Sequence, residues 1–174
     1  MTDSDRSYTG PPSIVDHDLN QHFPELHKFE STPDMESSAL YKAIQTDVER
    51  IMNAVVVEHL AKASSVERRK PDPNGPQKVI RALAWNIERG IRFDGIIDVL
   101  ISHPRLTDKD VLLLTELDHG MARSGNRFVA QEIARALNLN YAFAPVYIPL
   151  QKGSGVEAEM EGENTKSIHG LALF

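Results

Sequence analysis

The 174-residue sequence contains no cysteine, no excess of positive charge and no long hydrophobic run. Without cysteine, the chain forms no disulfide and offers no thiolate to a metal. The formal net charge of −6 argues against a broad binding surface for nucleic acid, but not against a phosphate-bearing substrate bound through a local metal ion. No segment approaches the roughly 20 apolar residues of a membrane helix, and the acidic N-terminus does not resemble a secretory signal. We therefore expect a soluble, cytoplasmic protein without a membrane span.

A proline-rich linker divides the chain. Residues 1–36 are rich in serine, aspartate, proline and histidine, which predicts a flexible arm. Residues 37–63 carry apolar residues at steps of three and four, which predicts a helical extension. Residues 64–77 include three prolines and a glycine close together and are expected to be the linker. The main domain is then expected over residues 78–174.

Strands and helices are expected to alternate after the linker. Apolar runs and helical periodicity predict strand 78–87, helix 95–103, strand 110–117, helix 127–138, strand 141–150 and a fourth strand at IHGLALF. The run DVLLLTEL is apolar on both faces and predicts a central strand. Prolines within 141–150 favour an edge strand or an early exit from the sheet. This order is typical of an α/β domain.

Two of the expected strands end on a polar residue that suits a hard cation. Asn86 ends LAWN and Glu116 ends DVLLLTE. Functional groups of α/β sheets gather beyond the carboxyl ends of central strands, so these side chains are expected to meet. Carboxylate and amide oxygens suit Mg²⁺ or Mn²⁺, and Asp118, two residues further on, would face the same side if the strand continues. Taken singly, an asparagine at a strand end is usually a turn residue, and a glutamate after a strand is most often a solvated rim residue or a helix-entry charge.

The segments LAWNIERG, DVLLLTELD, RSGNRFVAQEIARALNLNYAFAP and HGLALF, in this order, resemble the endonuclease/exonuclease/phosphatase superfamily, whose members have a DNase I-like fold. The first family motif is an apolar strand ending in W/Y-N, and the second is an apolar strand ending in Q/T-E. The resemblance covers residues 78–174 and is similar to bacterial members. It implies a partial DNase I-like α/β sandwich, with the first mixed sheet and its flanking helices, preceded by the N-terminal arm and helix.

The resemblance also implies site residues and a reaction. Glu116 would bind Mg²⁺ or Mn²⁺ directly, and Asn86 would hold the metal or the scissile phosphate. The cation would act as a Lewis acid in phosphodiester or phosphomonoester hydrolysis. HGLALF matches the family at Gly170 and Ala172 but has Leu171 where many members have asparagine.

The family's Asp-x-Asn motif and its later Asp-His motif, which supplies the general base, are missing from this sequence. We therefore expect the chain to represent the N-terminal half of the domain and to be weak or inactive on its own.

Four residues near the expected metal site are candidates for substrate binding. Arg123 is suited to anions. Asp118 and His119 follow the glutamate of the expected metal strand, and His169 leads the last strand. The alternatives are a solvated loop for Arg123 and an exposed loop position for His119. Glu88 and Arg89 either line the cleft or form a surface turn closed by Gly90.

The segment KGSGVE, residues 152–157, is not a P-loop, because no Gly-Lys-Ser/Thr follows it. It is expected to be a linker or a loop that covers the substrate.

Three functions fit the sequence. The first is a Mg²⁺-dependent phosphoesterase whose substrate is a nucleic acid, a lipid headgroup or a small phosphate ester. The second is a non-catalytic α/β module that binds a phosphorylated ligand or a partner domain, in which Asn86 and Glu116 are structural. The third is an interaction protein that works through residues 37–63. The sequence leaves the oligomeric state open.

Overall fold

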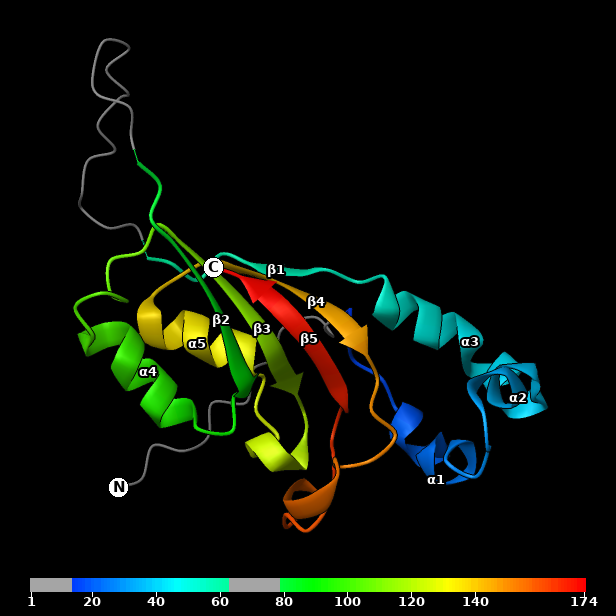
Figure 1. Cartoon of the computed structure of the whole chain (residues 1–174). Coiled ribbons are helices and arrows are strands. Elements are labelled where there is room, and N and C mark those ends of the chain that lie inside the picture. The colour runs from blue at the N-terminus through cyan, green and yellow to red at the C-terminus, as the bar shows by residue number, and fades with distance from the viewer. Residues whose placement is uncertain (1–13, 63–78) are drawn as a thin grey trace, which may run out of the picture.

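The computed structural model describes residues 14–62 and 79–174, and the rest of the predicted arm and linker lies outside this range. Five strands form one mixed sheet in the order β1-β4-β5-β3-β2. Their bounds are Val56–Glu58 for β1, Ala82–Arg89 for β2, Val111–His119 for β3, Tyr141–Tyr147 for β4 and Ile168–Leu173 for β5. Helices α4, Phe93–Ser102, and α5, Val129–Leu137, lie against the sheet (Figure 1). The expected α/β class is confirmed as a five-stranded mixed sheet with flanking helices.

The parallel pair of β2 and β3 brings the two polar strand ends together. A crossover through α4 joins them, and the register pairs Asn86 with Thr115, next to Glu116. β3 lies between β2 and β5, as its two apolar faces predict. β5 pairs antiparallel with both β3 and β4. The carboxyl ends of β2 and β3 and the start of β5 therefore share one end of the sheet.

Strand β4 is an interior strand rather than the edge strand that its prolines favoured. It pairs with β5 on one side and with β1 on the other. The pairing with β1 covers only Tyr141, Ala142 and Phe143. Pro145, which has no N–H to donate, therefore lies beyond the β1 pairing, and β4 ends at Tyr147.

One face of the sheet forms the core with α4 and α5. Alternate strand residues point into it, and they pack against the apolar stripe of each helix; among them are Leu112, Leu114, Leu117, Phe143, Ile168, Ile96, Leu100, Val129 and Ile133. The opposite face carries a cross-strand row that includes Leu113, Leu173 and Val57, whose exposed fractions are 45%, 46% and 56%. Within the described residues, the helices α4 and α5 thus cover one face, and the other is largely apolar and open.

Residues 14–37, most of which were predicted as a flexible arm, are folded against the rest of the chain. They contain a 3₁₀ helix, Leu19–His22, and two short helices, α1, Phe23–Leu26, and α2, Thr32–Ser37. Four apolar side chains of this segment are buried: Val15, Leu19, Phe23 and Leu26. Lys166 donates a hydrogen bond to the His17 carbonyl at 3.2 Å, and Asn20 donates to the Asn164 carbonyl at 2.6 Å. Contacts with residues distant in sequence order this segment, which is why its local composition did not reveal it.

The predicted helical extension is divided between a helix and a strand. Helix α3 spans Ala39–Met52, and its N-cap Ser38 accepts a hydrogen bond from the Tyr41 N–H at 3.0 Å. The β-branched run after it forms β1 instead of more helix. Glu58 of β1 accepts hydrogen bonds from Tyr141 and, at 2.7 Å, from Gln131. The extension is thereby tied to the sheet and to α5.

No helix within residues 14–62 or 79–174 has both the length and the apolar character needed to cross a lipid bilayer.

Candidate functional site

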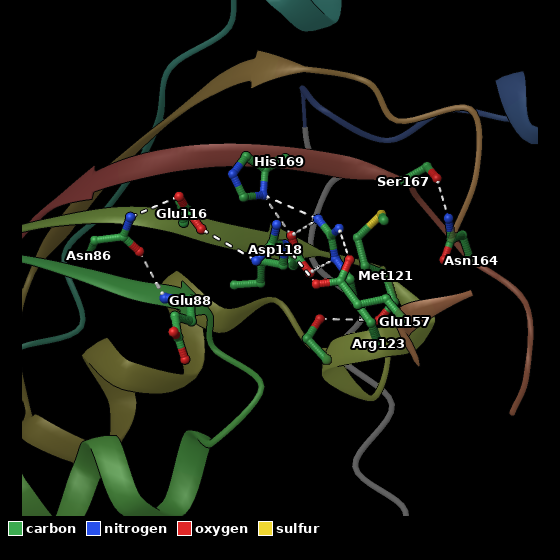
Figure 2. A network of polar contacts seen from close by, with 12 residues as sticks. Asn86, Glu88, Glu116, Asp118, Met121, Arg123, Glu157, Asn164, Ser167 and His169 are labelled. Carbon is green, nitrogen blue, oxygen red and sulfur yellow. Dashed lines mark hydrogen bonds and ion pairs between the residues drawn. The ribbon is translucent and has the colours of Figure 1, made fainter. Parts of the chain in front are cut away.

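The side chains of Asn86 and Glu116 meet at the carboxyl ends of β2 and β3. The Asn86 amide nitrogen donates a hydrogen bond to Glu116 Oε1 at 2.8 Å (Figure 2). The Asn86 carbonyl oxygen accepts from the Glu88 backbone N–H at 3.0 Å. These two bonds fix the orientation of the amide, because only the oxygen accepts and only the nitrogen donates. The amide nitrogen, not its oxygen, therefore faces the carboxylate.

Both strands depart from regular geometry at this pair. The β2–β3 register shifts between Asn86 and Arg89, and the β3–β5 register shifts between Thr115 and Leu117. Glu116 has a positive φ of 57°, and Arg89 has one of 66°. β-Bulges of this kind are frequent next to active sites, where they redirect a side chain. The bulge at Glu116 changes the direction of its side chain from the one that regular strand alternation would give.

A second group of polar residues lies beside this pair but is buried. The Arg123 guanidinium forms two hydrogen bonds with Asp118, from Nε at 2.8 Å and from Nη2 at 2.9 Å. His169 Nδ1 lies 2.7 Å from Asp118 Oδ1. The exposed side-chain fractions are 0% for Asp118, 5% for Arg123 and 6% for His169. We call these three residues the buried cluster.

Hydrogen-bonding chemistry assigns a proton to Nδ1 of His169. A carboxylate only accepts hydrogen bonds, so Nδ1 of His169 carries the proton that it shares with Asp118. The Tyr147 ring lies against the imidazole at a centroid distance of 4.7 Å. The other ring nitrogen, Nε2, is then the one that does not bond to Asp118.

Arg123 is held as a cation by its neighbours. Burial alone acts to lower the pKa of Arg123, but hydrogen bonds and charge from Asp118 and Glu157 outweigh it and raise the pKa above its usual value. Glu157 Oε2 accepts from Arg123 Nη1 at 3.0 Å. Arg123 is therefore not the free, solvated loop residue of the alternative interpretation.

A hydrogen-bonded turn positions both ends of the buried cluster. The Gly120 carbonyl accepts the backbone N–H groups of Thr165, Lys166 and Ser167 at 2.9–3.1 Å. Arg123 follows Gly120 on a 3₁₀ helix, Ala122–Ser124, and His169 follows Ser167 on β5. A Cβ at Gly120 would collide with the Lys166 backbone, so only glycine fits there. This connection fixes Arg123 relative to His169.

His119 lies away from the Asn86–Glu116 pair and the buried cluster. Its ring packs on Phe128 at a centroid distance of 4.1 Å, and Phe128 in turn contacts Phe143 of the core. Its Nδ1 is buried and has no hydrogen-bond partner in the described part of the chain. Burial lowers the pKa of His119 to about 4, which keeps the ring neutral near pH 7. The exposed loop position expected as its alternative does not occur, since the strand extends through His119.

The structure thus brings together five of the six predicted site residues, which are Asn86, Glu116, Asp118, Arg123 and His169. It adds Arg89, which the sequence placed either in the cleft or in a surface turn, and Glu157. Arg89 Nη1 lies 3.6 Å from Glu116 Oε2, and Arg89 Nε lies 3.2 Å from Glu157 Oε1. Glu157 comes from the loop that was expected to be a linker or a cover. The WNIERG segment offered a signal for Arg89, because it places this residue three positions after Asn86.

Among the described residues, no three histidine or acidic side chains are grouped as a closed metal site requires. Glu116 is the one carboxylate of the site whose oxygens are bound neither to the buried Arg123 nor to a backbone group, since its partners are Asn86 and Arg89. Mg²⁺ commonly binds through one or two carboxylates and keeps several waters. The donors at this end of the sheet therefore fit a water-rich Mg²⁺ site better than a closed protein cage.

No family model, curated protein or solved structure matches this chain.

Proposed function

We propose that the protein is a Mg²⁺-dependent phosphoesterase of the endonuclease/exonuclease/phosphatase type. The 2.8 Å hydrogen bond between Asn86 and Glu116, at the ends of adjacent parallel strands, is the observation that carries the proposal. It is supported by the order of the motifs in which these residues lie. The substrate class is a phosphate ester.

The proposal assigns Glu116 to the cation and Asn86 to the support of Glu116. The exposed side-chain fraction of Glu116 is 35%, so its carboxylate is accessible from solvent. The Asn86 amide directs an N–H at Glu116, and its oxygen accepts from the Glu88 backbone N–H. This orientation suits a residue that positions the carboxylate or donates to a phosphate oxygen. A bound Mg²⁺ or Mn²⁺ would supply Lewis-acid activation of the phosphate.

The buried cluster supplies an oriented base in this proposal. Asp118 holds the Nδ1 proton of His169, which leaves Nε2 with the lone pair that accepts a proton from water. Arg123 keeps Asp118 in place through two hydrogen bonds. This arrangement gives the chain a candidate base of its own, where the family motif for one is missing from the sequence.

Metal titration of the full chain tests the proposal. We expect Mn²⁺ binding, followed by calorimetry or electron paramagnetic resonance, to be lost in Glu116→Ala. Glu88→Gln is the matched control, because it removes an exposed carboxylate from the same end of the sheet. It should bind Mn²⁺ as the wild type does. Equal binding by wild type and Glu116→Ala would exclude the phosphoesterase and favour the non-catalytic phosphate-binding module.

A further inference from the structure

Two arginines from different elements converge on one carboxylate at the edge of the site. Arg89 ends β2, Arg123 lies on the 3₁₀ helix after β3, and Glu157 lies on the loop between β4 and β5. Arg89 Nε is 3.2 Å from Glu157 Oε1, and Arg123 Nη1 is 3.0 Å from Glu157 Oε2. We propose that Arg89 and Arg123 form a binding site for a phosphate group, and that Glu157 occupies it when no ligand is bound. The site adjoins Glu116, which lies 3.6 Å from Arg89 Nη1, but it binds its ligand without a cation.

The arginine site is preorganised by the fold. Asp118 fixes two nitrogens of Arg123, and the third nitrogen, Nη1, points to Glu157. Arg123 is only 5% exposed, so its guanidinium has few other positions. Little side-chain entropy is then lost when an anion binds there, which is the usual advantage of a fixed guanidinium.

Phosphate suits the two arginines better than the carboxylate of Glu157 does. Arg89 Nε is buried and has no aligned hydrogen-bond partner among the described residues, although Glu157 Oε1 lies within ion-pair distance. A carboxylate presents two coplanar oxygens, whereas a phosphate presents three or four in a tetrahedron. A phosphate is therefore able to offer Arg89 Nε an aligned acceptor while another of its oxygens accepts from Arg123 Nη1. Arginine–phosphate hydrogen bonds are among the strong, charge-assisted kind.

A shallow cavity of about 370 Å³, open to solvent, adjoins the two arginines and has room for the rest of a ligand. Its other walls include Tyr147, Leu150, Gln151 and Ser154. This mixture of one aromatic ring, an apolar side chain and a few polar groups is typical of small-molecule sites. A phosphate monoester is the ligand class that fits, with its dianion on the arginines and its organic group in the cavity.

The position of Glu157 depends on Gly153. Gly153 has a φ of 141°, and a Cβ at this position would collide with the Glu157 carboxylate. Glu157 itself lies on a three-residue 3₁₀ helix, Gly155–Glu157, in a long loop. Its displacement by a ligand thus involves this loop and not the sheet.

Phosphate titration of the full chain in EDTA tests the inference. The probe is inorganic phosphate, and its dissociation constant is measured by calorimetry. We expect Glu157→Gln to bind about tenfold more tightly than the wild type, because the competing anion is removed. We expect Arg89→Met to bind about tenfold more weakly, the equivalent of one charge-assisted hydrogen bond. Since EDTA removes divalent cations, this result and metal binding at Glu116 succeed or fail independently.

Matched variants separate the site from general electrostatics. Glu159→Gln removes an exposed charge from the same loop, and Arg105→Met removes one from the exposed turn before β3. Both are expected to bind phosphate as the wild type does. If Glu157→Gln does not fold, Gly153→Ala expels the same carboxylate and should tighten binding as well. The inference is overturned if neither change tightens binding, if Glu159→Gln tightens it equally, or if Arg89→Met binds like the wild type.

Discussion

Glu116 and Asp118 are two carboxylates on the same strand, two positions apart, with opposite surroundings. Glu116 is 35% exposed and has Asn86 and Arg89 as partners. Asp118 is fully buried and shares its oxygens between Arg123 and His169. A buried charge requires full pairing, whereas an exposed charge is stable in water without it. The comparison separates a carboxylate enclosed by its charged partners from one that is open to solvent.

The bulge at Glu116 produces this difference. Without it, the alternation of β3 would place both side chains in similar surroundings. The positive φ of Glu116 turns its carboxylate toward Asn86, and β3 then continues so that Asp118 pairs in register with His169. One irregular residue thus gives neighbouring acids two different surroundings.

The largest effect is expected when the buried carboxylate is changed. Asp118→Asn keeps the shape but leaves Arg123 buried without its main counter-ion, and we expect a loss of about 3–5 kcal/mol in the free energy of unfolding. Urea denaturation monitored by circular dichroism measures it.

The double variant Asp118→Leu/Arg123→Met removes both buried charges and should recover most of that loss. A loss below 1 kcal/mol in Asp118→Asn, within the range of exposed pairs, would remove the distinction between the two acids.

An intermediate effect on stability is expected from His119, the residue next to Asp118, and it depends on pH. The pKa of His119 is lowered by burial to about 4 from 6.5, so the unfolded chain binds a proton between these values that the folded chain does not. Stability should therefore be highest above pH 6.5 and fall as the pH drops toward 4, by on the order of 3 kcal/mol from this residue.

His119→Phe should flatten this pH dependence, although His17, whose pKa is also lowered by burial, keeps part of it. The exposed His103 is the control, and His103→Gln should leave the profile unchanged. Thermal unfolding followed between pH 4 and 8 makes the measurement. An unchanged slope in His119→Phe would show that the ring is not buried in its neutral form.

The smallest effect on stability is expected for the exposed carboxylate. Glu116→Gln keeps a partner for Asn86 and removes only a solvated charge, so the free energy of unfolding should change by less than about 0.5 kcal/mol. The same urea experiment as for Asp118→Asn measures it. A loss as large as that of Asp118→Asn would assign Glu116 to the fold rather than to a ligand.

Much of the fold was readable from the sequence. Hydrophobic periodicity predicted α4, α5 and β2–β5 to within a few residues, and the two polar strand ends predicted that Asn86 meets Glu116. These features depend on local pattern and on the parallel pairing of neighbouring strands. The DNase I-like assignment stays a prediction.

Other parts of the site depend on contacts that no local pattern carries. Arg123 is buried because Asp118 and Glu157 neutralise it, and Glu157 arrives from a loop whose sequence indicates only flexibility. Glu116 and Asp118 lie in different surroundings because of the bulge at Glu116, and no glycine in the sequence marks that bulge. The folding of residues 14–36 likewise depends on the distant loop that contains Asn164 and Lys166.

The positive φ of Glu116 has a consequence for attempts to raise the stability of the protein. Glu116 has a φ of 57°, and a residue other than glycine or asparagine in this conformation carries backbone strain of order 1 kcal/mol or more. Glycine at this position would relieve the strain but would remove the carboxylate that accepts the hydrogen bond from Asn86. Selection for thermal tolerance would therefore favour glycine at position 116, whereas selection for the proposed cation binding would favour glutamate.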